Sequence, residues 1–139
     1  MEQEQYKRNG QRVSASMRSI LIVDDEQPII DMLRDVLEEE GYTVVTARNG
    51  SEALNIVQQQ HVDLVLTDYM MPHMDGWHLS KHLRSNPQTA RIPVLIMSAV
   101  QVPRDGDFSS IIRKPFNLVD VLNDIGQHLD SSPPPPHED

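Results

Sequence analysis

Polar residues follow several short apolar runs of this sequence, at the points where those runs end. Asp24 and Asp25 end RSILIVDD, Asp68 ends VDLVLTD, Ser98 ends IPVLIMS, and Lys114 follows SSIIR. Such runs are typical of strands buried on both faces. In open α/β sheets, binding and catalytic sites lie at the carboxyl ends of the parallel strands. The sequence therefore predicts a site that combines three carboxylates, a hydroxyl and an ammonium group.

The clustered carboxylates are expected to need a cation, because like charges at close range repel one another. All-oxygen ligands favour Mg²⁺, which binds few carboxylates and keeps several waters. An aspartate can act as a nucleophile and form an aspartyl phosphate. The metal and Lys114 would then neutralise charge on the transferring oxygens, and Ser98 would hydrogen-bond one of them. The pattern indicates phosphoryl transfer to a carboxylate.

Strand-like and helix-like segments alternate along the chain and must position these residues. Strands are expected at 18–25, 43–47, 62–68, 92–98 and 109–113, and helices at 28–41, 51–60, 75–85 and 117–130. Pro28, Asp75 and Asn117 stand at expected helix starts, where proline and short polar side chains are preferred. The alternation predicts parallel pairing through right-handed crossovers, and hence a layered α/β sandwich.

Composition and charge exclude several classes of protein. The chain has 139 residues, enough for one domain. Its net charge of −9, with no basic cluster, argues against binding to nucleic acid or to an anionic membrane. There is no cysteine, no apolar run approaches the ~20 residues that span a bilayer, and the N-terminus lacks a secretory signal. A cytoplasmic location is the expectation.

The ends of the chain are expected to lie outside the folded domain. Residues 1–17 show no periodicity and are interpreted as a flexible N-terminal arm. Residues 18–130 form the domain. Residues 131–139 include PPPP and are interpreted as a disordered proline-rich tail.

Over residues 18–130 the chain resembles the receiver domain of two-component response regulators. The resemblance rests on Asp24-Asp25, on the run DYMMPHMDG from Asp68 to Gly76, on Ser98-Ala99, and on Lys114-Pro115-Phe116. It implies a three-layer, doubly wound fold around a five-stranded parallel sheet, in the flavodoxin-like order 2-1-3-4-5. No output domain follows in the sequence, so a stand-alone receiver is expected.

The resemblance also implies a role for each acid. Asp68 would be the phosphoacceptor in a two-component phosphorelay. Asp25 would bind Mg²⁺ directly and Asp24 through water, with Asp68 and the backbone carbonyl of Met70 completing the metal's protein ligands. The implied partners are a histidine kinase or phosphotransfer protein and an unknown downstream target.

Two further residues complete the implied site. Ser98 and Lys114 would contact the phosphoryl group and relay its presence. The Lys114-Pro115 bond is expected to be cis, because receivers use that bend to aim the lysine at the acids and only an X-Pro bond is cis at low cost.

The segment between Ser98 and Lys114 departs from the family pattern. It holds only fifteen residues, AVQVPRDGDFSSIIR, where the family has a longer segment that contains a whole helix. Pro103 and Gly106 further disfavour a helix. We therefore expect the family's fourth helix to be lost or reduced to a turn.

Loss of that helix is expected to uncover apolar side chains of the last two strands and their connection, namely Ile111, Val100 and Val102. Exposed apolar patches mark contact sites, so partner docking or a homodimer through residues 99–111 is expected. In the alternative, the segment folds over the strands and Phe108 covers them.

Ile111 also stands where the family commonly has Tyr or Phe, whose ring swings inward on signalling, so a different output route is expected.

Other functions are less well matched by the residues. A phosphohydrolase of the haloacid-dehalogenase type carries Asp-x-Asp after its first strand, whereas Asp24 and Asp25 are adjacent. A pseudo-receiver used only for interaction is expected to lack an acid or the lysine, and none is missing. His78 and His82 stand four apart but no third ligand is identifiable, so solvated side chains are expected. A receiver would catalyse only its own phosphorylation and dephosphorylation.

Overall fold

The computed structural model describes residues 18–103 and 105–131. Its elements in chain order are β1 (Ser19–Val23), α2 (Gln27–Glu39), β2 (Thr43–Ala47), α3 (Gly50–Gln59), β3 (Leu64–Asp68), α4 (Gly76–Ser85), β4 (Val94–Ser98), β5 (Ser110–Arg113) and α5 (Leu118–Ser131). No helix within this part of the chain is long and apolar enough to cross a membrane. The expected arm, 1–17, and residues 132–139 of the expected tail lie outside the described residues.

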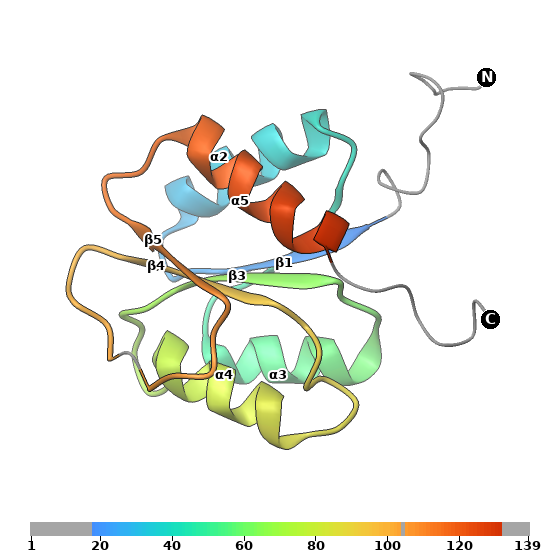
Figure 1. The fold of residues 1–139 in the computed structure, drawn as a ribbon, viewed down its shortest axis with the longest axis vertical. Coiled ribbons are helices and arrows are strands. Elements are labelled where there is room, and N and C mark those ends of the chain that lie inside the picture. Colours follow the sequence, from blue (N-terminus) through green and yellow to red (C-terminus); the bar gives the residue numbers. More distant parts are fainter. Residues whose placement is uncertain (1–17, 104, 132–139) are drawn as a thin grey trace.

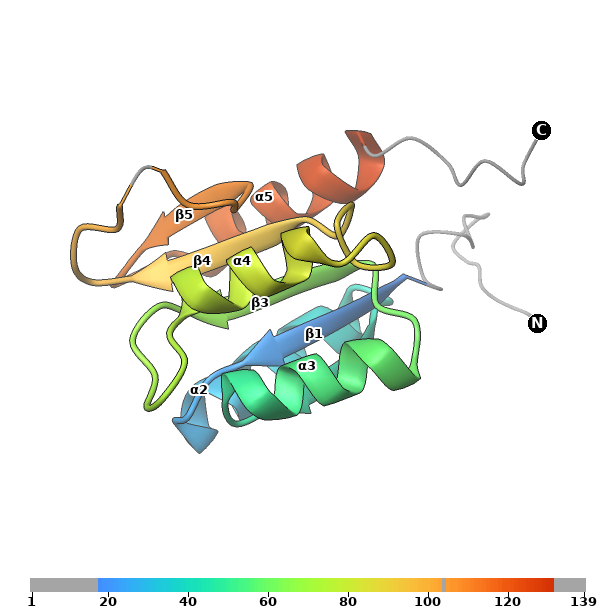
Figure 2. The same cartoon turned by 90° about the horizontal axis from the view of Figure 1, so that it is seen from below.

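The strands form one parallel sheet in the order β2-β1-β3-β4-β5. Helices α2 and α5 cover one face, and α3 and α4 cover the other (Figure 1). The predicted fold class and strand order are therefore confirmed. Asp68 pairs with Met97, and Ser98 pairs with Arg113. The carboxyl ends of β3, β4 and β5 are thus adjacent, as the view from below also shows (Figure 2).

Local sequence accounts for where the helices begin. Asp75 is the N-cap of α4 and accepts a hydrogen bond from the backbone N–H of His78 at 2.8 Å. Asn49 caps α3 in the same way, accepting from the N–H of Glu52 at 2.9 Å. These side chains satisfy backbone donors that have no partner inside the helix. The predicted strand starts at 62, 92 and 109 are early by one or two residues.

Two apolar layers form the core, one on each face of the sheet. Side chains of alternating strand residues enter opposite layers, so Ile20 and Leu66 pack towards α2 and α5 while Leu21 and Val65 pack towards α3 and α4. Every residue of β1, β3 and β4 is buried. These strands are central because they are apolar on both faces.

Leu66→Ala is expected to lower the free energy of unfolding by about 2–5 kcal/mol, because it removes buried methyl groups and leaves a cavity. Leu66 is fully buried in the middle of β3. Val119→Ala on α5 is the control, since that side chain is 61% exposed and its loss should change stability by no more than about 0.5 kcal/mol. Urea unfolding measures both. Equal values would mean that β3 is not the centre of the core.

The described part of the connection between β4 and β5, residues 99–103 and 105–109, contains no helix. We call these residues the crossover segment. The expected loss of the fourth helix is confirmed, but the expected exposure of apolar side chains is wrong for Val102, which is only 8% exposed. Phe108 and Ile111 also pack against the core layer that contains α3 and α4. Of the three residues expected to be uncovered, only Val100 is largely exposed, at 47%.

Candidate functional site

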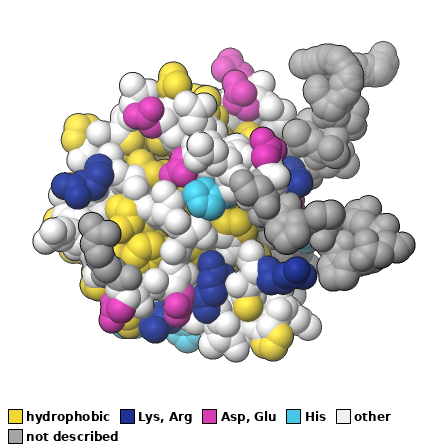
Figure 3. All heavy atoms as spheres, in the orientation of Figure 1, with side chains coloured by type: hydrophobic (Ala, Val, Ile, Leu, Met, Phe, Trp, Pro, Cys, Tyr) yellow, Lys and Arg dark blue, Asp and Glu magenta, His cyan; other side chains and the backbone are white. Residues whose placement is uncertain are grey.

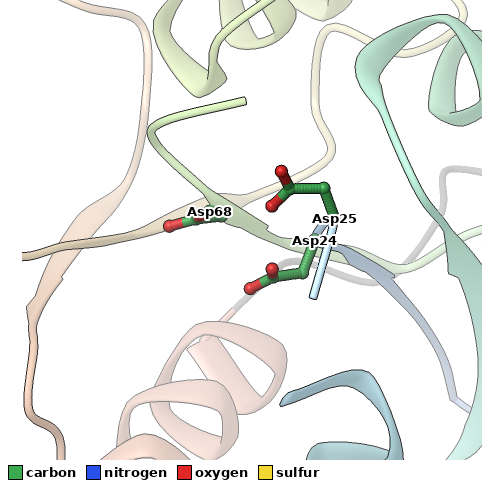
Figure 4. Close-up of side chains that lie close together, drawn as sticks. All are labelled: Asp24, Asp25 and Asp68. Atoms are coloured by element: carbon green, nitrogen blue, oxygen red, sulfur yellow. The ribbon is translucent and has the colours of Figure 1, made fainter. Parts of the chain in front are cut away.

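Three carboxylates meet where β1 and β3 end. One carboxylate oxygen from each of Asp24, Asp25 and Asp68 lies within 4.8 Å of the others. The side chains extend to the same side of the sheet edge (Figure 4). Asp24 and Asp68 are buried and Asp25 is exposed, so the cluster opens to solvent on the Asp25 side. The structure brings together the acids that the sequence placed at strand ends.

The buried carboxylate of Asp24 has one satisfied oxygen and one free one. Its Oδ1 accepts a hydrogen bond from the backbone N–H of Glu26 at 2.9 Å. Its Oδ2 is buried and has no hydrogen-bond partner among the described residues. Burial, reinforced by the charge of Asp68, raises the pKa of Asp24 to about 6. A cation in this cluster would offset both the burial and the repulsion, so the donor set fits a hard divalent metal such as Mg²⁺.

Lys114 supplies a positive charge beside Asp68. Its Nζ lies 2.9 Å from Oδ1 of Asp68, and both side chains are largely buried. Burial alone would lower the pKa of Lys114, but the hydrogen bond and charge of Asp68 outweigh it and raise that pKa. The ammonium is therefore charged at neutral pH. The Lys114-Pro115 peptide bond is cis, as expected.

Ser98 ends β4 beside Asp68 and is only 1% exposed. Its hydroxyl donates a hydrogen bond to the backbone carbonyl of Val100 at 2.8 Å and accepts one from the N–H of Val100 at 3.0 Å. The sequence placed Ser98 at the site but gave no sign of Val100 as its partner, because the pairing depends on how the chain turns after the strand.

Gly76 has a role at the site that sequence reasoning missed. A Cβ built on it would lie 2.8 Å from the backbone carbonyl oxygen of Asp68 and 3.2 Å from Cα of Tyr69. Its N–H donates to the carbonyl of Tyr69 at 2.9 Å. Only glycine allows the start of α4 to approach the acceptor strand this closely. The signal was its place directly after Asp75, in the run that begins at Asp68.

Two other groups do not join the site. His78 bonds to Asp75 through Nδ1 at 2.8 Å, and His82 is exposed. Within the described ranges, the acid cluster is the sole group of three or more side chains arranged to ligate a metal. Met70 is the second residue after β3, and its side chain is 62% exposed.

Taken together, the fold and the site define a doubly wound α/β domain in which a cluster of acids and a lysine surround the buried Asp68. The family model described as "Response regulator receiver domain" matches residues 20–125. The chain therefore belongs to the response regulator receiver domain family.

Two known response regulators are similar to this chain in sequence. The response regulator GtcR of Aneurinibacillus migulanus is 38% identical over 120 residues, which are 81% of this chain and 48% of GtcR. This chain thus spans about half the length of that relative. The polar-differentiation response regulator DivK of Brucella ovis is 29% identical over 118 residues, covering 81% of this chain and 96% of DivK.

A solved structure agrees with the fold. The signal receiver domain of a signal transduction histidine kinase from Syntrophus aciditrophicus superposes with a TM-score of 0.78 at 31% identity, covering 82% of this chain and 91% of that one. The resemblance stated from the sequence is confirmed.

Proposed function

We propose that this receiver is a phosphorylatable switch in which Asp68 accepts a phosphoryl group from a phosphohistidine donor. The observation that carries the proposal is the position of the Asp68 carboxylate, which lies 2.9 Å from the Lys114 ammonium and clusters with Asp24 and Asp25. A carboxylate that could act as a nucleophile thus lies beside an ammonium group and within a set of oxygen ligands that could hold a cation. A histidine kinase or a phosphotransfer protein is the donor, and the modified surface acts on a downstream protein.

The transfer needs no other nucleophile. An oxygen of Asp68 attacks phosphorus, the bond between phosphorus and the donor's imidazole nitrogen breaks, and the imidazole leaves with that electron pair. Lys114 pairs with the negative oxygens of the phosphoryl group as it is transferred. Such electrostatic stabilisation is the main contribution that a protein makes to phosphoryl transfer. The Ser98 hydroxyl donates a hydrogen bond to one phosphoryl oxygen. The same residues support hydrolysis, so the chain catalyses only its own phosphorylation and dephosphorylation.

The metal is the other source of positive charge. Asp24, Asp25, Asp68 and the backbone carbonyl of Met70 would hold Mg²⁺, which supplies charge neutralisation for the phosphoryl oxygens when bound. The unpartnered Oδ2 of Asp24 supports this assignment. The Asp24 carboxylate is buried, and the hydrogen bond that it accepts from the backbone N–H of Glu26 holds its orientation.

The test is the intact mass of the full chain after incubation with acetyl phosphate, with Mg²⁺ or with excess chelator. One added phosphoryl mass in Mg²⁺ and none in chelator is the expected result. Sustained turnover of a phosphate ester without a modified protein would indicate a phosphohydrolase instead. No mass gain together with no Mg²⁺ binding would indicate a module that acts by interaction alone.

A further inference from the structure

Positive charge is concentrated in one stretch of this acidic chain. Residues 76–93, which are α4, the turn after it and the residues that lead into β4, contain Lys81, Arg84 and Arg91 and no Asp or Glu. This stretch carries a charge of +3 and the rest of the chain carries −12, which together give the net charge of −9. The protein therefore has a part whose charge is opposite to that of the remainder.

Two hydrogen bonds from Arg84 hold the turn after α4 against that helix. Its guanidinium donates through Nη1 to the backbone carbonyls of Ala90 at 2.9 Å and Ile92 at 2.8 Å. Arg91 lies between those two residues and its side chain is exposed, so it is held beside α4. The sequence shows no basic cluster because the turn separates Arg91 from the helix along the chain, whereas the fold brings it back.

A cavity of about 490 Å³ lies at this part of the surface, and its lining residues are His78, Lys81, His82, Arg84, Ser85 and Asp107. Figure 3 shows Lys and Arg side chains over α4 and the turn after it, and Asp and Glu side chains over α2 and α5. Among the described lining residues, Asp107 is the only acid, and it lies 3.4 Å from Lys81. An exposed pair of this kind contributes at most about 1 kcal/mol, so another carboxylate can replace Asp107. We call His78, Lys81, His82, Arg84 and Arg91 the basic surface.

We propose that the basic surface is a docking site for an acidic segment of a partner protein. Carboxylates of that segment pair with Lys81 and Arg91, and one of them takes the place of Asp107 beside Lys81. A second copy of this chain fits less well, because two bodies with a net charge of −9 repel one another. A nucleic acid also fits less well, because a long polyanion would meet the acidic remainder of the surface. The proposal needs no phosphoryl group at Asp68, so it stands apart from the proposed function.

The test measures binding of a fluorescein-labelled polyglutamate peptide to the full, unphosphorylated chain by fluorescence anisotropy, with a polyglutamine peptide of equal length as the uncharged comparison. Only the glutamate peptide should bind, and its affinity should fall about tenfold between about 20 and about 200 mM salt, because salt screens exposed charges. Trp77, the sole tryptophan, has its ring centroid 5.1 Å from Nζ of Lys81, so its emission should change on binding. Equal binding of the two peptides, or no binding of the glutamate peptide at low salt, overturns the proposal.

Variants separate this surface from the overall charge of the protein. Lys81→Glu and Arg91→Glu should each weaken binding of the glutamate peptide at least about fivefold, because an attractive contact becomes a repulsive one. Arg48→Glu is the matched control, since it makes the same change of charge at an exposed position before α3, and it should alter the affinity less than about twofold. Asp107→Asn should strengthen binding about twofold, because it frees Lys81. If Lys81→Glu and Arg91→Glu bind the peptide as Arg48→Glu does, the proposal fails.

Two further measurements distinguish the other occupants. Sedimentation of the chain alone at low salt should show no association through the basic surface. Association that Lys81→Glu and Arg91→Glu abolish would make a second copy the occupant. A single-stranded DNA of matched charge should bind more weakly than the glutamate peptide, and equal or tighter binding would make a nucleic acid the occupant. Either result overturns the assignment to an acidic protein segment.

Discussion

Asp25→Ala is expected to abolish the stabilisation that Mg²⁺ gives to this protein and, with it, phosphorylation. Asp25 is the exposed member of the acid cluster, so it is the carboxylate best placed to receive a hydrated cation. A ligand that binds only the folded state stabilises it by about 1.4 kcal/mol at ten times its dissociation constant. Thermal unfolding with and without Mg²⁺ measures this shift.

The control for Asp25→Ala is Asp35→Ala, which removes the same charge from an exposed position on α2. It should keep both the Mg²⁺-dependent shift and the reaction with acetyl phosphate. A full Mg²⁺ shift in Asp25→Ala would contradict the assignment of Asp25 as a metal ligand.

Lys114→Met is expected to slow phosphorylation by about 10²–10³-fold, because a preorganised charge facing the transferring group is lost. The Mg²⁺-dependent shift in melting temperature should remain, since Lys114 is not one of the proposed metal ligands. The time course of mass gain measures the rate. The two predictions thus separate the contribution of the metal from that of the ammonium group, because each variant removes only one of these positive charges.

Lys81→Met provides the comparison for Lys114→Met, because Lys81 lies on α4 and pairs with Asp107 rather than with an acid of the site. Its rate should match that of the unmodified chain. If Lys114→Met reacts as fast as Lys81→Met, the 2.9 Å contact with Asp68 is structural and the proposed role of the ammonium is wrong.

Much of this site could be predicted from sequence because its residues end strands. The apolar runs fixed where β1, β3 and β4 lie, and parallel pairing then brought Asp24, Asp68 and Ser98 to one edge. Helix caps such as Asp75 were also predictable, because capping depends on a side chain and a backbone group only three residues apart.

The crossover segment could not be predicted in the same way. Its contacts join residues far apart in the chain, such as Gly106 with Trp77, and no periodic pattern marks them. The short length of the connection between β4 and β5 correctly predicted that a helix is missing there. It did not show that Val102 would be buried, because that depends on which way an irregular segment folds over the strands.

The most direct test of the central claim is the intact mass of Asp68→Asn after treatment with acetyl phosphate and Mg²⁺, compared with the unmodified chain. The substitution keeps the shape of the side chain and removes its nucleophilic charge. The unmodified chain should gain one phosphoryl mass and Asp68→Asn should gain none, while both unfold cooperatively. An equal gain in Asp68→Asn would show that another residue accepts the phosphoryl group, and would contradict the account given for this site.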